Sequence, residues 1–287
     1  MIDLDEFAVA VGGEGPVTIS GLGTRGGPVP GVRCVHAPAG IEWVQADEMI
    51  VSCGAATPVD ELVAALAEHG QTIALPSGGT VGGALAVGRS DIRRLGYGPV
   101  RDVLLQARYV SAAGEIVKAG GPTVKNVSGF DVCRLLVGSH GTLGFLGDVI
   151  LRTRPLPQAS QWFTCGSDDP YDVFAALYKP ISVLWNGSTL WALLEGHPAD
   201  IAEQAAATGL SPTDGPPLLP TGSRRSVPPA MLTTLGGKFV AEVGVGIVHH
   251  AEPQAAGAVS VERTVALSAA VRHEFDPTGR LNPGLDV

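Results

Sequence analysis

Apolar residues in the first 155 positions recur with two different periods, which predict alternating strands and helices. The run Glu48–Cys53 predicts a short strand. A helix start follows, with Thr57 as N-cap, Pro58 at the first helical position and Asp60 three residues after the cap. An apolar stripe then runs to a stop at Gly70, and it consists of Val59, Leu62, Val63 and Leu66. This helix is predicted to be structural.

The remainder of this first block continues the same alternation. Strands are predicted over Asp102–Val110, Ile116–Lys118 and Phe145–Thr153, and a short helix over Val132–Val137. The stretch Arg154–Pro157 holds two prolines and predicts a domain boundary.

The second block has a different texture. Its predicted order is helix, strand, strand, helix, long Pro- and Gly-rich loop, strand and helix, over Tyr171–Lys179, Ile181–Trp185, Ser188–Leu194, Asp200–Ala207, Ser211–Pro229, Lys238–Val248 and Val261–His273. This order is typical of an α+β fold. We therefore expect a first domain over 1–155, a small α+β cap or substrate domain over 156–260, and a helix and tail over 261–287 that return to the first domain.

Composition narrows the function classes. The chain has 287 residues, 45% of them hydrophobic, which is enough to bury a large core. A net charge of -9 and 5% aromatic residues argue against a nucleic-acid partner. The four cysteines show no C-x-x-C spacing and no other metal-ligand pattern appears, so no metal site is predicted. An acidic N-terminus and the lack of a spanning apolar stretch predict a cytoplasmic protein without membrane insertion.

One short motif raises the question of a dinucleotide. After the apolar run Pro16–Ile19, Gly21, Gly23 and Gly26 form G-x-G-x-x-G. In a Rossmann fold the last glycine opens a helix, but here Pro28 and Pro30 follow, and proline interrupts a helix. The glycines therefore lie in an open loop, either a plain surface turn or a loop whose N–H groups bind an anion. NAD binding is the least favoured interpretation.

Two further glycine loops belong to the same block. They are Leu75–Gly83 and Gly138–Gly144, and each combines glycines with Ser or Thr. Such loops let backbone approach a ligand closely while hydroxyls bond to it. Three loops converging on one elongated cofactor would explain the repeated composition, and three independent turns are the alternative.

Several segments in order resemble a known family. They are Thr80–Gly83, Tyr97–Asp102, Gly120–Gly121, Lys125–Asp131, Gly138–Gly144 and, at the C-terminal end, Phe275–Gly284. Together they are similar to FAD-linked oxidases of the vanillyl-alcohol-oxidase, or PCMH, type. The K-N-V-S-G-F-D element resembles most closely the FAD-binding subunit of bacterial glycolate oxidase. The resemblance implies a two-subdomain PCMH-type FAD-binding domain with a small α+β cap.

The resemblance also implies which residues bind FAD. Gly21 to Gly26 would wrap the pyrophosphate, and the other two loops would line the flavin and ADP portions. The implied set is Gly21, Gly23, Thr24, Arg25, Gly26, Pro76, Thr80, Val81, Gly82, Gly83, Lys125, Asn126, Gly129, Phe130, Asp131, Gly138, Ser139, Gly141, Thr142, Leu143, Gly144, Phe145 and Asn282. Some relatives attach the flavin covalently through His or Cys. Thr24 and Val87 stand in those neighbourhoods, so non-covalent FAD is predicted. Valine at Gly82 or Gly141 is expected to occupy the space of the cofactor.

Oxidation of a 2-hydroxy acid moves a hydride from its α-carbon to flavin N5 while a base takes the hydroxyl proton. An arginine can bind the substrate carboxylate with two donors, and a histidine can accept the hydroxyl proton near neutral pH. His249 and His250 directly follow the last predicted strand of the cap, and Arg224 and Arg225 precede it in the long loop. His249, His250 and Arg225 are the catalytic candidates, and solvated loop residues are the alternative.

Two functions remain open. The chain is either the FAD-binding subunit of a glycolate-oxidase-like 2-hydroxy-acid dehydrogenase or an accessory FAD subunit that relays electrons. The resemblance implies a larger FAD subunit and an iron–sulfur subunit as partners, and peripheral membrane attachment through such a complex. An NAD enzyme and a flavin-free interaction module are further alternatives.

Overall fold

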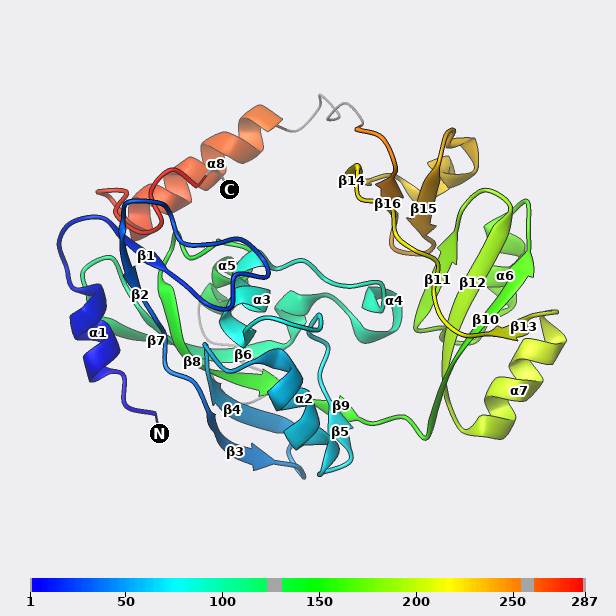
Figure 1. The fold of residues 1–287 in the computed structure, drawn as a ribbon, viewed down its shortest axis with the longest axis horizontal. Helices are drawn as coiled ribbons and strands as arrows, with labels where there is room; N and C mark the ends of the chain where they lie inside the picture. The colour runs from blue at the N-terminus through cyan, green and yellow to red at the C-terminus, as the bar shows by residue number, and fades with distance from the viewer. Residues whose placement is uncertain (1, 123–130, 254–260, 286–287) are drawn as a thin grey trace. The chain divides into compact units, whose positions relative to one another are not determined.

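The computed structural model describes residues 2–122, 131–253 and 261–285, which form two compact units (Figure 1). The first unit comprises Met1–Asp91, Pro99–Leu156 and Ser260–Val287, and the second comprises Ile92–Gly98 and Pro157–Val259. Residues 92–98 were expected in the first domain. They belong instead to the second unit, because Leu95 packs against its hydrophobic core.

An antiparallel sheet forms the centre of the first unit. In the described residues its strand order is β3 (Ile41–Gln45), β4 (Ile50–Gly54), β8 (Phe145–Arg152), β6 (Leu104–Val110) and β7 (Ile116–Gly120). The middle strand, β8, is buried at every position except its last. A strand covered on both faces reads as a continuous apolar run, which is why it was visible in the sequence.

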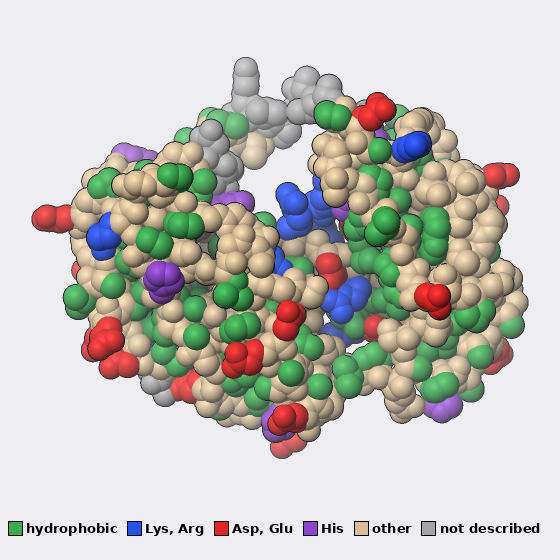
Figure 2. Space-filling model, viewed as in Figure 1, with side chains coloured by type: hydrophobic (Ala, Val, Ile, Leu, Met, Phe, Trp, Pro, Cys, Tyr) green, Lys and Arg blue, Asp and Glu red, His purple; other side chains and the backbone are tan. Residues whose placement is uncertain are grey.

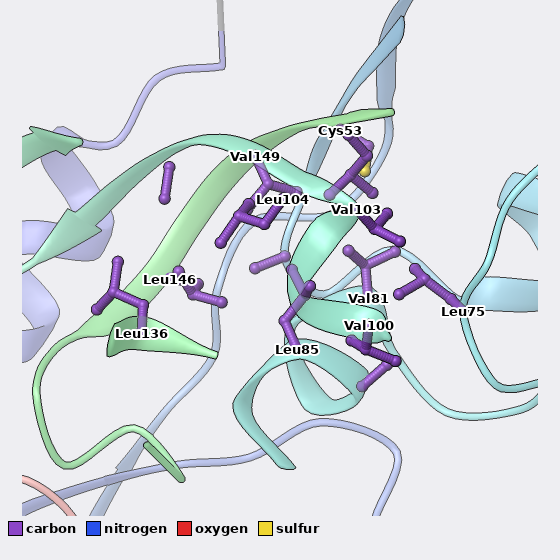
Figure 3. Close-up of a cluster of buried hydrophobic side chains, with 14 of the residues drawn as sticks. Cys53, Leu75, Val81, Leu85, Val100, Val103, Leu104, Leu136, Leu146 and Val149 are labelled. Carbon is purple, nitrogen blue, oxygen red and sulfur yellow. The ribbon is translucent and has the colours of Figure 1, made fainter. Parts of the chain in front are cut away.

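Short helices cover one face of this sheet. They are α2 (Val59–Ala67), α3 (Val81–Val87) and α5 (Val132–Leu136). Figure 3 shows Val81 and Leu85 of α3 among side chains from β6 and β8, which belong to the same core cluster. The predicted cap of α2 is wrong in detail: Pro58 is the N-cap, and the Thr57 hydroxyl accepts from Gly40 N at 2.9 Å. Thr57 therefore joins α2 to the β3 end of the sheet.

The two chain ends of the described structure meet in a smaller layer of the first unit. There β1 (Val17–Ile19) pairs in parallel with β2 (Arg33–Val35), and Val17 also forms a parallel bridge with Leu281. Arg280, only 5% exposed, donates to carbonyls near the end of α1 (Asp5–Val11), namely those of Val11, Gly12, Glu14 and Gly15, and to that of Ala112. Cations favour a helix C-terminus, so this buried guanidinium suits its place.

The remaining elements of the first unit are two short segments and one long helix. A two-stranded sheet joins β5 (Gln71–Thr72) to β9 (Arg154–Pro155), and Val100–Asp102 form a 3-10 helix. The longest helix among the described residues, α8 (Val261–Phe275), packs Val271 and Phe275 against the first core.

The second unit contains an antiparallel sheet with helices against its core face. The strand order in the described residues is β13 (Ser211–Thr213), β10 (Ala159–Gly166), β12 (Thr189–Gly196), β11 (Ser182–Trp185), β15 (Phe239–Glu242), β16 (Ile247–His250) and β14 (Ser223–Ser226). The unit's helical segments are α4 (Arg94–Tyr97), α6 (Pro170–Ala176), α7 (Pro198–Ala207) and a 3-10 helix over Pro229–Thr234.

Two predictions for this unit are wrong. The single strand expected over 238–248 is a hairpin, because Gly244 (φ 81°) and Gly246 (φ 76°) adopt left-handed conformations that turn the chain between β15 and β16. The long loop expected over 211–229 contains β13 and β14, which pair with β10 and β16.

Figure 2 shows Asp and Glu side chains scattered over the visible face and not gathered in one patch. Among the described residues, no helix is both long and apolar enough to cross a membrane. Within the same residues, His, Cys, Asp and Glu side chains form no group of three or more arranged to hold a metal ion.

Candidate functional site

A single cavity of about 270 Å³ in the first unit gathers the three glycine loops. The first loop contributes 19–27, α3 and its cap contribute from Thr80 to Val87, and the third loop contributes from Ser139 to Leu146. The C-terminal tail completes the wall with Asn282 and Leu285. The loops are therefore not independent turns but walls of one site.

The first loop stays open, as its prolines predict. No helix occurs among the described residues that follow Gly26 until α2, so the G-x-G-x-x-G motif is not a Rossmann fingerprint. A Cβ added at Gly23, Gly26 or Gly27 would meet no atom within 4 Å. The backbone of this loop is therefore accessible to a ligand at close range.

The second loop leads into α3, part of which lines the cavity. Thr80 caps α3, because its hydroxyl oxygen accepts a hydrogen bond from Gly83 N at 3.1 Å. A Cβ on Gly21 would lie 2.9 Å from the same hydroxyl oxygen. The first loop therefore approaches the helix cap so closely that glycine is required at Gly21.

The third loop is anchored on the other end of α3. Gly138 N donates to Leu85 O at 3.0 Å, and His140 N donates to Ala86 O at 2.9 Å. Inside the loop, the Ser139 hydroxyl donates to Leu136 O at 2.8 Å. These bonds fix His140 in a left-handed conformation (φ 52°), which is uncommon for a residue with a side chain.

Asn282 ties the tail to two walls at once. Its Oδ1 accepts from the Thr18 hydroxyl at 2.8 Å and from Ile19 N at 3.2 Å, and its Nδ2 donates to His140 O at 2.7 Å. Asn282 is 4% exposed and also left-handed (φ 45°), a conformation that asparagine tolerates better than most residues. The residue thus holds the cavity together even though its side-chain amide is already satisfied by protein.

Arg25 joins the first loop to the second. Its guanidinium donates to three carbonyls, those of Gly78 at 2.6 Å, Ser77 at 2.8 Å and Pro76 at 2.9 Å. Burial lowers the pKa of Arg25 from its ordinary value, and the nearby Asp60 carboxylate acts in the opposite direction. The side chain predicted to bind cofactor therefore spends three of its donors on the protein itself.

The lining chemistry fits FAD. The cavity wall contains Arg25 and no Asp or Glu among the described residues, so nothing there repels a diphosphate, although the chain as a whole is acidic. Apolar side chains form much of the remaining wall and suit an aromatic ring. They include Leu22, Ala37, Ala86, Val87, Leu136, Phe145, Leu146 and Leu285. A site with an open glycine loop at one part and an apolar wall elsewhere matches a molecule that carries both a pyrophosphate and an isoalloxazine.

The predicted cofactor residues fall into three groups. Those that line the cavity are Gly21, Gly23, Thr24, Arg25, Gly26, Thr80, Gly82, Gly83, Ser139, Gly141, Gly144, Phe145 and Asn282. Those that lie elsewhere in the described structure are Pro76, Val81, Asp131, Gly138, Thr142 and Leu143. Lys125, Asn126, Gly129 and Phe130 lie outside the described residues.

The second group has other structural tasks. Val81 and Leu143 are buried in the first core, and Thr142 donates to Ser139 O at 2.7 Å. Asp131 is exposed; it caps α5 and pairs with Arg134, whose Nε lies 2.9 Å from its Oδ2. A residue that lies next to a cavity-lining residue in the sequence therefore does not necessarily face the cavity itself.

The expected effect of valine at Gly82 or Gly141 is also different from the prediction. A Cβ at Gly82 would lie 2.9 Å from Ala55 O, and one at Gly141 would lie 2.8 Å from Asn282 Nδ2. Both substitutions would collide with protein before reaching a ligand, so neither tests the cofactor alone.

The catalytic candidates lie in the second unit, on strands whose side chains alternate between two faces. His250 (3% exposed) shares the core face with Phe239 and Val248, and its Nε2 accepts from Arg225 Nε at 3.1 Å. Burial, then Arg225, then His249 lower the pKa of His250. His250 and Arg225 thus bind each other beside the core.

His249 points to the opposite face of that sheet. It lies across from Arg224 on β14, and its Nε2 is 2.9 Å from Oε1 of the buried Glu242. Because the two histidines face opposite sides, they cannot act together on one ligand. Glu242 was not singled out in the sequence, since only the hairpin register brings it to His249.

Several lining residues were missed for a related reason. Ala37, Ala55, Ala56, Ala86 and Leu285 line the cavity, yet small apolar residues in sequence look like ordinary core positions. Arg280, which supports the tail, was missed as well, because its five carbonyl partners are distant in sequence.

Comparison with known proteins identifies the class of this site. Residues 14–120 match a family model described as an FAD binding domain. This part of the chain therefore resembles an FAD-binding domain, and FAD is the cofactor of the chain.

The most similar curated relatives include particular oxidoreductases. The chain is 35% identical over 169 residues to glycolate oxidase subunit GlcE of Escherichia coli, an alignment that covers 55% of this chain and 47% of that protein. It is 36% identical over 142 residues to a D-lactate dehydrogenase of Archaeoglobus fulgidus, which covers 47% of this chain and 32% of that protein. The aligned part therefore spans less than half the length of each of these relatives.

A solved structure confirms the fold. An alkyldihydroxyacetonephosphate synthase superposes with a TM-score of 0.66 at 14% identity, covering 98% of this chain and 72% of that one. The predicted α+β fold is confirmed.

Proposed function

We propose that this chain is the FAD-binding subunit of a dehydrogenase that oxidises a 2-hydroxy acid of the glycolate or lactate class. The observation that carries the proposal is the convergence of the three glycine loops and the tail on one cavity. The relatives that match this part of the chain are named for glycolate and D-lactate oxidation, which supports the substrate class.

Bound FAD would supply the acceptor for the hydride that leaves the substrate α-carbon. The chain's own residues would hold that cofactor. The open backbone at Gly23 and Gly26 suits the pyrophosphate, and the wall formed by Ala86, Val87 and Phe145 suits the ring. His249 remains the candidate base, and Glu242 would hold its Nε2.

A second candidate is an accessory subunit that binds FAD and relays electrons without substrate chemistry. The observation in its favour is that His250 and Arg225, two of the three predicted catalytic residues, are engaged with each other beside a hydrophobic core. The word "subunit" in the name of the Escherichia coli relative supports a multi-subunit complex for both candidates. A larger FAD subunit and an iron–sulfur subunit remain the proposed partners.

Anaerobic mixing of the purified yellow chain with glycolate and, separately, D-lactate tests the proposal. Bleaching of the visible flavin absorbance supports a dehydrogenase subunit. An unchanged spectrum with both acids supports the accessory role. A colourless chain that takes up no added FAD would contradict both.

The attachment of the cofactor is proposed to be non-covalent. Thr24 and Val87 both line the cavity and neither is a His or Cys, whereas His140 is the one histidine among the described lining residues. Acid precipitation should therefore leave all FAD in the supernatant. Yellow colour in the washed pellet would contradict this, and its loss in His140→Ala would identify the attachment point.

A further inference from the structure

Arg25 is the one arginine among the described residues that line the FAD cavity, so its role decides how the anionic part of the cofactor is held. An arginine beside a diphosphate is ordinarily expected to bind it directly, with its forked donors on phosphate oxygens. Here Nη1 donates to Gly78 O, and Nη2 donates to both Pro76 O and Ser77 O. The fork is directed at the second loop.

The second loop is held from its other side as well. Asp60, in the first turn of α2, accepts from Gly78 N at 3.0 Å. The peptide groups on the two sides of Gly78 are thus bonded to Arg25 through the carbonyl and to Asp60 through the N–H. We refer to Arg25, Asp60 and the segment Pro76–Gly78 as the loop latch.

The residue that follows the latch is packed closely against the first loop. Gly79 is left-handed (φ 68°), and a Cβ there would collide with Arg25 Nη1 and with Thr24 Oγ1. Thr80 follows directly and caps α3, with Gly21 packed against its side chain. The position of the first loop over α3 therefore depends on the latch.

We propose that Arg25 is a positioning residue for the cofactor, which preorganises the first glycine loop instead of binding phosphate through its charge. The pyrophosphate is then held by the loop backbone, and the arginine acts through the second loop. This inference rests on the FAD-binding function proposed above.

Charge and position predict different outcomes for two substitutions. Arg25→Lys keeps the positive charge but cannot reach three carbonyls with one planar fork. The latch predicts that it weakens FAD binding as much as Arg25→Gln does, by at least ~10-fold in Kd, equivalent to about 1.4 kcal/mol. Direct charge pairing predicts that Arg25→Lys binds FAD almost as well as the unmodified chain.

Asp60→Ala separates the two mechanisms by sign. It removes a negative charge near the cavity, so a purely electrostatic role of this region predicts tighter FAD binding. The latch predicts weaker binding, because Gly78 N loses its acceptor.

The experiment titrates FAD into the cofactor-stripped full-length variants and records flavin fluorescence, with thermal unfolding of each cofactor-free variant as a second measurement. Arg33→Lys is the matched control, because Arg33 also donates to backbone carbonyls, those of Ala10 and Val11, but does not line the cavity. It should leave the Kd within about twofold.

The outcomes are distinguishable. Arg25→Lys that binds FAD like the unmodified chain, or Asp60→Ala that binds it more tightly, overturns the latch and leaves the FAD function intact. An unmodified chain that binds no FAD overturns both. If Arg25→Lys does not fold, the sign of the Asp60→Ala effect still decides.

Discussion

Asn282 offers the sharpest test of how the cavity is built. Substitution by glycine removes three hydrogen bonds made by the buried Asn282 side chain, to the Thr18 hydroxyl, to Ile19 N and to His140 O. Each buried group left without a partner costs about 1–3 kcal/mol. The Thr18 hydroxyl still accepts from Val29 N at 3.0 Å, so part of its bonding survives. We expect a loss of about 2–4 kcal/mol in the free energy of unfolding of the first unit.

Two related substitutions divide this loss into its parts. Asn282→Ala should cost about 1 kcal/mol more than Asn282→Gly, because alanine is strained at φ 45° and glycine is not. Asn282→Asp keeps the acceptor for Thr18 and Ile19 but loses the donor to His140 O, so it should weaken the third loop selectively.

Urea unfolding of the holoprotein, monitored by flavin release, gives the free energy, and hydrogen exchange locates the change. Exchange should accelerate at 17–19 and 139–145 in Asn282→Gly, but only at 139–145 in Asn282→Asp. Thr278→Ala is the control in the same tail, where only a 3.2 Å bond to Asp276 is lost. A loss below about 0.5 kcal/mol in Asn282→Gly, the size of an ordinary surface substitution, would refute the reasoning.

Three further predictions follow from the same structure. Ala86→Leu adds volume to the cavity wall, so fluorescence titration should show an FAD affinity at least ~10-fold lower than that of the unmodified chain. Ala64→Leu, on the exposed side of α2, is the control and should not change the affinity. Equal affinities of the two variants would contradict the assignment of Ala86 to the wall. Burial raises the pKa of Cys53 to about 12, so between the ordinary thiol value and that pH the unfolded chain binds fewer protons, and the free energy of unfolding should fall by up to ~1.4 kcal/mol per pH unit in alkaline urea titrations. Cys53→Ala should reduce this slope without abolishing it, because burial also raises the pKa of Cys133 to about 11; an unchanged slope in Cys53→Ala would contradict the assignment. The pKa of His250 is lowered, so the unfolded chain takes up the proton before the folded chain does, and the free energy of unfolding should decrease as pH falls below the ordinary histidine value. His250→Phe should lose this dependence, and an unchanged acid slope in that variant would contradict the prediction.

The sequence predicted the structure best where a short stretch of residues determines the local conformation by itself. The central strand β8 is apolar along almost its whole length, and Pro28 and Pro30 exclude a helix after Gly26, so both features were predictable. The three loops were grouped by composition alone, and the cavity confirms that they meet.

Pairing between distant segments could not be predicted in the same way. Successive side chains of β16 face opposite sides of the sheet, which separates His249 from His250, and the hairpin register brings Glu242 to His249. Both arrangements depend on the turn between β15 and β16, which the continuous apolar run in the sequence did not reveal. Arg25 was placed among the cofactor residues by the resemblance of its loop, and its three carbonyl acceptors, which lie about 50 residues away in sequence, could not be predicted.

The bridge between Val17 and Leu281 has a consequence for biosynthesis. Its partners are separated by nearly the whole chain, and Arg280 and Asn282 beside it contact residues 11–19 and 140. A nascent chain that has not yet exposed this tail lacks one wall of its flavin pocket, however well the earlier segments have folded. We therefore expect cofactor loading to follow translation of the tail, so that a ribosome stalled shortly before it would carry a colourless intermediate.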